Sequence, residues 1–266
     1  MGRPKAGLEW HGSTLLYRTA ALLARTVGGP IVVVSAPDQR FPELPADVLV
    51  VADPVCGLGP MQGLAAGLAA VAADAPVAFV CSTDLPFLHP AFVRRVLRGF
   101  ADDTDVVLPV ARGFRQPLAA GYRTALAGLI ETLLGEGNPR PGMLFGHCRV
   151  AQLDDDTLLA DADLARLDPA LASVVNINHP DDYAAARCTP PPEVVVERGG
   201  AAAGGGGPGP RTVRVATLGA AADAVGLTLD RHVVAAVNGD RMPRDARLPL
   251  VTGDTVAFRS AAGYSS

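Results

Sequence analysis

The sequence predicts an α/β fold with a doubly wound, mostly parallel sheet, followed by a smaller second domain. One observation is a set of short, continuous apolar runs, which are typical of strands covered on both faces. Another is that helix-like segments rich in Leu, Ala, Val and Arg separate these runs. A third is the abrupt change of composition after residue 187, where proline and glycine become frequent.

The first predicted domain covers residues 1–187. Strands are expected at 31–34, 48–51, 77–81 and 105–110, and helices at 13–27, 60–73 and 89–101. Because strands that alternate with helices form βαβ units, their strands should run parallel with helices on both faces of the sheet.

The second predicted domain covers residues 188–266 and contains a Gly-rich tract at 199–210, which is typical of a flexible linker or long loop. Strands are expected at 194–196, 211–217, 233–240 and 254–258, with a helix at 218–225. The Asn238-Gly239-Asp240 sequence is a good hairpin signal. This strand–strand–helix–strand–strand order in so short a segment predicts a β-grasp module.

Composition and charge exclude several classes of protein. Hydrophobic residues at 49% and charged residues at 19% fit a globular chain with a core. A net charge of −4 argues against nucleic acid or an anionic membrane as the main partner, because phosphate surfaces require clustered Lys and Arg. The four cysteines lack a metal-binding spacing, and no apolar run has membrane-spanning length or a signal-peptide layout. We expect a cytoplasmic protein with free thiols.

Two acidic residues follow predicted strands, at the sheet edge where open α/β folds place their ligands. Asp84 follows the buried run 77–81, and Asp53 follows the run before it. After Asp53, Gly59 would let the backbone approach a ligand, and Pro60 would begin a helix whose positive N-terminus faces the site. The alternatives are a helix N-cap for Asp84, and an Asp-Pro turn with tight helix–strand packing for the segment around Gly59.

Asn176 and Asn178 are the last candidates. Residues two apart in an extended segment point the same way, so both amides should lie on one face. Amides that face a site can recognise a polar ligand by hydrogen bonds. Asn-rich turn chemistry before a helix is the alternative.

Several segments, taken in order, resemble the signature blocks of the molybdenum cofactor guanylyltransferase family. Residues 1–12 resemble the second half of its L-A-G-G-x-S-x-R-M-G-x-x-K-x-L loop, and residues 51–68 its D-x-x-x-x-x-G-P-L-x-G-I block. Residues 80–88 resemble its C-D-x-P and D-M-P-F motif, residues 115–120 its H-P-x-x-A block, and residues 174–183 its N-x-N-T-P-E-D-L signature.

The resemblance implies a Rossmann-like nucleotidyltransferase that transfers GMP from GTP to molybdopterin and releases pyrophosphate. It assigns Asp84 to Mg²⁺, Lys5 to the phosphates, Asp53, Gly59 and Pro60 to the nucleotide, and Asn176 and Asn178 to the pterin. A nucleophilic phosphate is already ionised at neutral pH, so the lack of a Ser-His-Asp or Cys-His arrangement fits this reaction. A solvated Lys5, transfer from CTP or ATP, a sugar-phosphate substrate and a non-catalytic adaptor remain alternatives.

The sequence departs from the family at its N-terminus, where the first strand and the L-A-G-G-x-S-x-R half of the loop have no counterpart. That strand would lie in the middle of the sheet, and its absence should expose unpaired backbone on both neighbours. We therefore expect the reading frame upstream of Met1 to encode an apolar strand and a Gly-Gly-x-Ser-x-Arg loop.

The second domain resembles sulfur-carrier β-grasp proteins, such as the small subunit of molybdopterin synthase and the thiamine sulfur carrier. The similar segments are 237–240, 250–254 and 260–263. Those families end in Gly-Gly, whereas this sequence ends Gly-Tyr-Ser-Ser at 263–266. We therefore expect no thiocarboxylate at this terminus. Docking of protein partners in molybdenum cofactor biosynthesis fits the sequence at least as well as a sulfur-carrier role.

Overall fold

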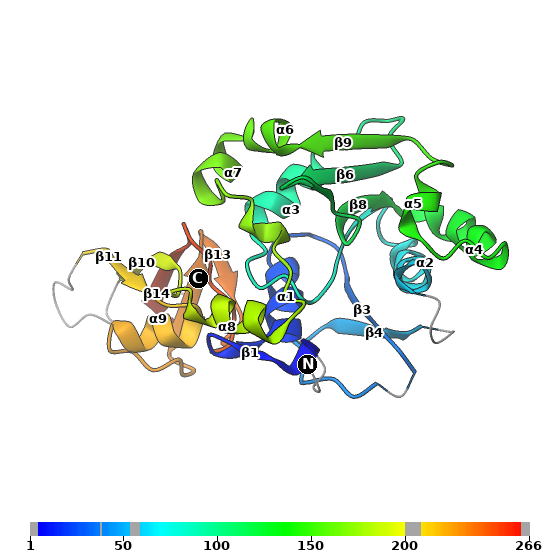
Figure 1. The fold of residues 1–266 in the computed structure, drawn as a ribbon. Coiled ribbons are helices and arrows are strands. Elements are labelled where there is room, and N and C mark those ends of the chain that lie inside the picture. Colours follow the sequence, from blue (N-terminus) through cyan, green and yellow to red (C-terminus); the bar gives the residue numbers. More distant parts are fainter. Residues whose placement is uncertain (1–4, 38, 54–58, 200–208, 262–266) are drawn as a thin grey trace. The chain divides into compact units, whose positions relative to one another are not determined.

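The computed structural model describes residues 5–37, 39–53, 59–199 and 209–261 (Figure 1). The chain forms two compact units. The larger unit comprises Gly2–Gly7 and Leu15–Ile177, and the smaller unit comprises Met1, Leu8–Thr14 and Asn178–Ser266. None of the described helices is both long and apolar enough to cross a lipid bilayer.

The larger unit contains every strand expected in the first domain. β3 (Ile31–Ser35) and β4 (Val48–Ala52) form a parallel pair of their own. A second sheet has the order β5-β8-β6-β7, with β9 paired to β6. Its strands are β5 (Val77–Cys81), β6 (Val106–Ala111), β7 (Phe114–Arg115), β8 (Ala119–Arg123) and β9 (Val150–Asp154).

The expected helices are also present, each slightly shorter than predicted. They are α1 (Leu15–Ala24), α2 (Pro60–Val71) and α3 (Pro90–Leu97). Proline occupies the first turn of α2 and α3, where the missing N–H would have no partner in the helix. The unit also contains η1 (Lys5–Gly7), η2 (Thr124–Leu126), η3 (Ala172–Val174), α4 (Ala127–Gly135), α5 (Pro141–Leu144), α6 (Asp155–Leu159) and α7 (Ala162–Leu167).

The main core of the larger unit lies between α2, α4 and the second sheet. Leu68 of α2, Tyr122 of β8 and Ile130 of α4 are completely buried in one apolar cluster. Gly67 allows α2 to approach β3 closely, since a Cβ there would lie 3.2 Å from a methyl group of Val34. This close approach packs α2 against β3.

The prediction of a mostly parallel sheet needs correction, because the pairing is mixed. β3–β4 and β6–β9 are parallel, whereas β5–β8, β6–β7 and β6–β8 are antiparallel. The chain reverses after β6 at Arg112 and Gly113, whose φ angles are 55° and 82°. This tight turn returns the chain as β7 and β8, and β8 then separates β5 from β6.

The smaller unit combines an N-terminal hairpin with the C-terminal part of the chain. The hairpin strands are β1 (Glu9–Trp10) and β2 (Ser13–Thr14). The Trp10 indole N–H donates to the carbonyl of Ala186 in α8 (Pro180–Cys188), at 3.3 Å. Because these contacts join α8 to the smaller unit, the division falls between Ile177 and Asn178. The domain limit expected after residue 187 remains a prediction.

The C-terminal strands form one sheet of order β11-β10-β14-β12-β13. β10 and β14 pair in parallel and the other neighbours are antiparallel. Asn238 and Gly239, with φ angles of 54° and 94°, make the predicted turn between β12 and β13. The elements are β10 (Glu193–Arg198), β11 (Arg211–Arg214), α9 (Leu218–Ala224), β12 (Val233–Val237), β13 (Asp240–Met242) and β14 (Thr255–Ser260).

Candidate functional site

Asp84 lies in the turn that follows β5. Its side chain is 15% exposed, and its Oδ2 atom accepts a hydrogen bond from Lys5 Nζ at 3.0 Å. The Ser82 hydroxyl donates to the other carboxylate oxygen. The carboxylate is therefore held at the end of a half-buried strand by one cation and one hydroxyl.

Lys5 belongs to η1, and its side chain is 34% exposed. The ion pair with Asp84 joins residues that are far apart in the sequence. The alternative of a purely solvated lysine is therefore wrong for this structure, because the ammonium group is anchored on a partly buried carboxylate. The structure brings together the two residues expected to bind phosphates and metal.

A capping role for Asp84 is excluded by the start of the next helix. His89 is the N-cap residue of α3, and its Nδ1 atom accepts the N–H of Ala91 at 3.1 Å. Asp84 therefore performs no capping function there. The described partners of its carboxylate are Lys5 and Ser82.

Two distant segments converge on the turn that carries Asp84. The Ser82 N–H donates to the carbonyl of Leu118 at 3.0 Å, which continues the pairing of β5 with β8. The Ile177 N–H donates to the carbonyl of Asp84 at 2.9 Å. Ile177 is buried, whereas Asn176 beside it is exposed. Asn176 is thus held one residue from a direct backbone contact with Asp84.

Asn178 begins the smaller unit. Its backbone N–H and that of His179 both donate to the Asp182 carboxylate, which forms the cap of α8. Asn178 is exposed, as Asn176 is, with the buried Ile177 between them. Exposed, buried and exposed residues alternate along 176–178, and the cap-forming turn expected as the alternative is present. A shared face for the two amides stays a prediction.

Asp53 lies directly after β4, whereas Gly59 and Pro60 stand at the start of α2. Asp53 follows β4, and its N–H donates to the carbonyl of Ser35 at 2.7 Å. Gly59 has φ 75° and ψ −170°, a conformation that disfavours any side chain. None of the described side chains caps α2, and Pro60 opens the helix. Residues 54–58 of this family-like block lie outside the described residues.

Arg18 positions the loop after Asp84, although the sequence patterns do not predict it as a site residue. Arg18 is buried in α1, and its Nε–H donates to the carbonyl of Pro86 at 3.0 Å. The available signal was that Arg18 is the one charged residue among residues 15–24. A buried arginine is rare without such a partner.

Cys81 is the last residue of β5 and lies near Asp84. Burial, with a contribution from the negative charge of Asp84, raises the pKa of the Cys81 thiol to about 12. The thiol is therefore neutral at physiological pH, and Cys81 is a poor nucleophile or metal ligand. Within the described ranges, no three His, Cys, Asp or Glu side chains gather as a metal site. A cation at this edge would depend on Asp84 and on oxygen atoms of a substrate.

The chain matches one protein-family model, and two relatives that share a name resemble it. Residues 1–147 match the model of the family described as MobA-like NTP transferase domain. A protein of Mycobacterium bovis (strain BCG / Pasteur 1173P2), named probable molybdenum cofactor guanylyltransferase, is 38% identical over 148 residues, 54% of this chain and 72% of that protein. A protein of Bacillus cereus (strain AH187) with the same name is 27% identical over 188 residues, 70% of this chain and 88% of that protein.

A solved structure also resembles this chain. It is molybdopterin-guanine dinucleotide biosynthesis protein A from Archaeoglobus fulgidus, with a TM-score of 0.54 and 21% sequence identity. The match covers 70% of this chain and 90% of that one. At this level of identity the likeness bears on the fold alone.

Proposed function

Because the chain belongs to the MobA-like NTP transferase family, we propose that its larger unit performs guanylyl transfer in molybdenum cofactor biosynthesis. The chain is a nucleotidyltransferase that transfers GMP from GTP to molybdopterin, giving the guanine dinucleotide form and pyrophosphate. The observation that carries the assignment of the site is the Lys5–Asp84 pair at the end of β5.

The reaction requires positioning and charge neutralisation more than proton transfer. An oxygen of the molybdopterin phosphate attacks the α-phosphorus of GTP, and the bond from that phosphorus to the pyrophosphate breaks. Because this phosphate oxygen is already negative at neutral pH, no general base is needed. We assign Lys5 to the phosphates, where its ammonium group would offset the charge of the triphosphate.

A nucleotidyltransferase of this type needs a divalent metal, and we assign Mg²⁺ to Asp84. The donor set is suitable, because Mg²⁺ is commonly bound through one or two carboxylates together with substrate phosphates. Asp84 supplies the carboxylate and Ser82 a neighbouring hydroxyl. When bound, Mg²⁺ would neutralise negative charge on the triphosphate oxygens. Asp84 would then exchange its contact with Lys5 for the metal, which frees the ammonium for a phosphate.

The remaining site residues are assigned to the two substrates. Asp53, Gly59 and Pro60 are assigned to GTP, since an open helix start directs backbone N–H groups and positive potential outwards. Asn176 and Asn178 are assigned to the pterin, since their amides are exposed while Ile177 between them is buried.

We also propose that the smaller unit contains a β-grasp module that docks protein partners in molybdenum cofactor biosynthesis. Support comes from the sheet order β11-β10-β14-β12-β13 and from α9, which follows the β10–β11 pair in the chain. The predicted inability of the terminus to form a thiocarboxylate concerns residues 263–266, which lie outside the described residues. The cytoplasmic location likewise remains a proposal.

Calorimetry with GTP, CTP and ATP in the presence of Mg²⁺ tests the nucleotide. We expect GTP to bind more tightly than the other two nucleotides, and pyrophosphate release to require both GTP and molybdopterin. Preference for CTP or ATP would assign a related transferase. Failure of every nucleotide to bind, in a folded protein, would favour the non-catalytic adaptor.

A further inference from the structure

An aromatic side chain of the larger unit stands open to solvent just after β6. Phe114, the first residue of β7, is 73% exposed, more than any other large apolar side chain that the structure describes. A Cβ on the neighbouring Gly113 would meet no atom within 4 Å, so the turn beside Phe114 borders open space. Exposure of a phenyl ring to water is unfavourable, and a flat ring that binds against it removes that exposure.

The turn that carries Phe114 is anchored by Arg112. The Arg112 N–H donates to Asp155 Oδ1 at 2.9 Å, and the Arg112 guanidinium donates to the carbonyl of Ala170 at 2.8 Å. Phe114 itself pairs with Ala111 across the β6–β7 ladder. The backbone at Phe114 is therefore fixed before any ligand arrives, which lowers the entropic cost of binding there.

This turn and the Asp84 turn lie along one edge of the sheet. β5 and β6 both run antiparallel to β8, so the carboxyl ends of β5 and β6 are at the same edge. The segment 170–177 accepts a hydrogen bond from Arg112 at one end and donates one to the carbonyl of Asp84 at the other. The two turns are thus joined by the segment that contains Asn176.

The face of the sheet on which Phe114 lies indicates which substrate it can meet. Val106 and Leu108 of β6 pack with α2 in the apolar core, so the even positions of this strand face α2. Val107 lies on the opposite face, beside the glycine that follows α3. Ala111 shares the face of Val107, and Phe114 pairs with Ala111, so Phe114 lies on the α3 face. The start of α2, which we assign to GTP, belongs to the other face.

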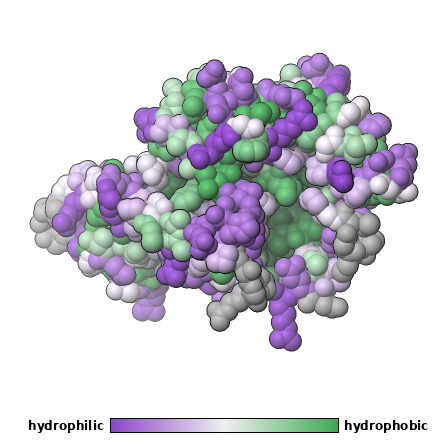
Figure 2. Space-filling view, viewed as in Figure 1, coloured by the Kyte–Doolittle hydropathy of each residue, from purple (hydrophilic) through white to green (hydrophobic). Residues whose placement is uncertain are grey.

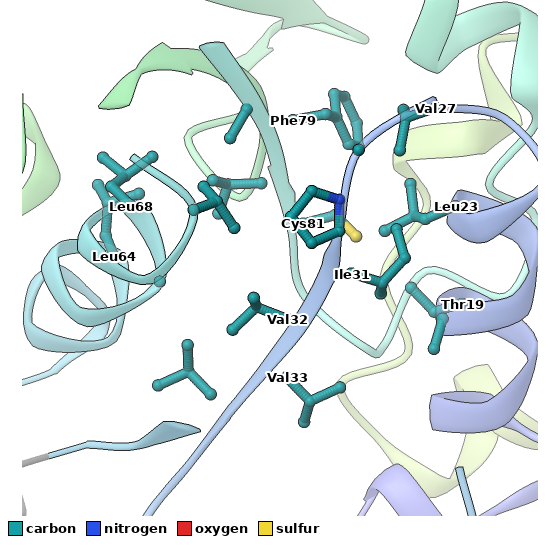
Figure 3. Close-up of a pocket in the computed structure, with 18 of the residues that line it drawn as sticks. Thr19, Leu23, Val27, Ile31, Val32, Val33, Leu64, Leu68, Phe79 and Cys81 are labelled. Atoms are coloured by element: carbon teal, nitrogen blue, oxygen red, sulfur yellow. The ribbon is translucent and has the colours of Figure 1, made fainter. Parts of the chain in front are cut away.

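Another place for a flat ring would be an apolar cavity of about 480 Å³ lined by β3, β5, α1 and α2 (Figure 3). In the space-filling view, hydrophobic residues line a hollow on the face of this unit (Figure 2). The aromatic ring in the cavity lining, Phe79, already packs edge to face against Phe92, with ring centroids 6.4 Å apart. The polar ring atoms of a pterin would lose their hydrogen bonds to water among Leu23, Leu64 and Val32. An exposed ring at the sheet edge leaves those atoms hydrated, so it suits a pterin better than the cavity does.

We propose that Phe114 is a specificity-determining residue for molybdopterin, whose flat pterin ring system stacks on the exposed phenyl ring. The proposal rests on the guanylyl transfer proposed above. Stacking recognises the planar ring system, and the exposed Asn176 amide can hydrogen-bond to its polar rim. Molybdopterin then approaches the Asp84 turn from the α3 face, while GTP approaches it from the α2 face.

Equilibrium binding to the full chain tests the contact without turnover. The probe is an oxidised, fluorescent pterin phosphate, titrated in the absence of GTP and followed by fluorescence anisotropy. We expect Phe114→Ala to weaken binding by about 5- to 100-fold, the range typical of stacking lost from a nucleobase. Phe114→Tyr keeps the ring face and should retain the affinity, whereas Phe114→Leu keeps only the apolar bulk and should resemble the alanine variant. Because Phe114 is exposed, each variant should fold normally.

The matched control is Leu49→Ala, since Leu49 is an apolar residue of β4 that is 51% exposed. It should leave the affinity for the pterin phosphate unchanged. Equal affinity of Phe114→Ala and the unaltered protein would overturn the proposal. So would a Phe114→Leu variant that binds as tightly as Phe114→Tyr, because plain apolar contact would then suffice. Absence of probe binding to the unaltered protein would overturn it too.

Steady-state kinetics distinguish the pterin from guanine, which is also a flat nitrogen heterocycle. Phe114→Ala should raise the KM for molybdopterin and leave the KM for GTP unchanged. A raised KM for GTP alone would overturn the proposal in favour of the guanine ring. The guanylyl-transfer assignment fails separately, if the unaltered protein binds the pterin phosphate but releases no pyrophosphate from GTP and molybdopterin.

Discussion

Replacement of Asp84 by asparagine is the most direct test of the site. Asp84→Asn retains the size of the side chain and one carbonyl oxygen, but removes the charge expected to hold Mg²⁺ against the triphosphate. By analogy with other transition-state charge stabilisation, this loss should cost on the order of 3–4 kcal/mol, or about two to three decades in kcat. The expected defect is therefore far larger than ordinary variation between preparations.

The stability cost should be small by comparison. The asparagine oxygen can still accept from Lys5 or Ser82, and the Lys5 side chain is 34% exposed, so its ammonium group can be hydrated. Such a partly exposed ion pair contributes about 1 kcal/mol or less to the free energy of unfolding. Activity should consequently be lost while the thermal transition changes by only a few degrees.

The assay is pyrophosphate release from GTP and molybdopterin over a titration with Mg²⁺. The matched control is Asp103→Asn, because Asp103 is an exposed aspartate of the same unit. Near-normal turnover of Asp84→Asn at saturating Mg²⁺ would refute the metal assignment and direct attention to Asp53. Unfolding together with loss of activity would instead assign Asp84 a structural role. Calorimetry of GTP binding with and without Mg²⁺ gives a second readout, independent of turnover.

Three further predictions concern other parts of the larger unit. Asn176→Ala should raise the KM for molybdopterin by up to roughly tenfold at constant thermal stability, because the amide is exposed and Ile177 provides the packing; an unchanged KM would contradict it. Gly59→Ala should lower the free energy of unfolding by about 1–2 kcal/mol in denaturant titrations, because φ is 75° there. An unchanged free energy of unfolding would contradict the idea that a side chain at this position strains the backbone. The Arg149 backbone N–H holds the pKa of Asp105 below its ordinary 3.8, so this carboxylate stabilises the fold above that pH. Asp105→Asn should therefore lower the free energy of unfolding by its full amount at pH 7. This decrease should disappear as the pH falls through the folded-state pKa of Asp105, as pH-dependent denaturation would measure.

The local pattern of the sequence predicted the strand that positions Asp84. Val77–Cys81 is a short continuous apolar run, and a run of this length favours a strand over a helix. The pairing direction could not be predicted in this way, because a short apolar strand reads the same in a parallel and in an antiparallel sheet. The reversal at Arg112 and Gly113 sets the direction in which the strands pair. It depends on positive φ angles at both residues, which an Arg-Gly pair does not by itself predict.

Long-range contacts of the site were predictable only in part. Lys5 was found through a family motif, since nothing in its local sequence indicates a partner 79 residues away. The bond from the Ile177 N–H to the Asp84 carbonyl has no sequence signal at all, because any residue except proline can donate it. The Asn176–Asn178 spacing predicts that these two side chains share a face. The residues that lie next to them in the fold depend on tertiary packing, which the spacing does not indicate.

The Lys5–Asp84 pair is compatible with a working site because it is weak enough to open. A partly exposed ion pair contributes little net free energy, since hydration of the separated charges nearly compensates for their attraction. A triphosphate with its metal offers both partners stronger interactions: phosphate oxygens for the ammonium group and a divalent cation for the carboxylate. The pair therefore keeps both charges compensated before substrate binds, and holds Lys5 and Asp84 together at the edge where we propose that the phosphates bind. If Lys5 instead served only to neutralise a structural carboxylate, Lys5→Met would leave the affinity for GTP unchanged, whereas a phosphate contact predicts that it weakens.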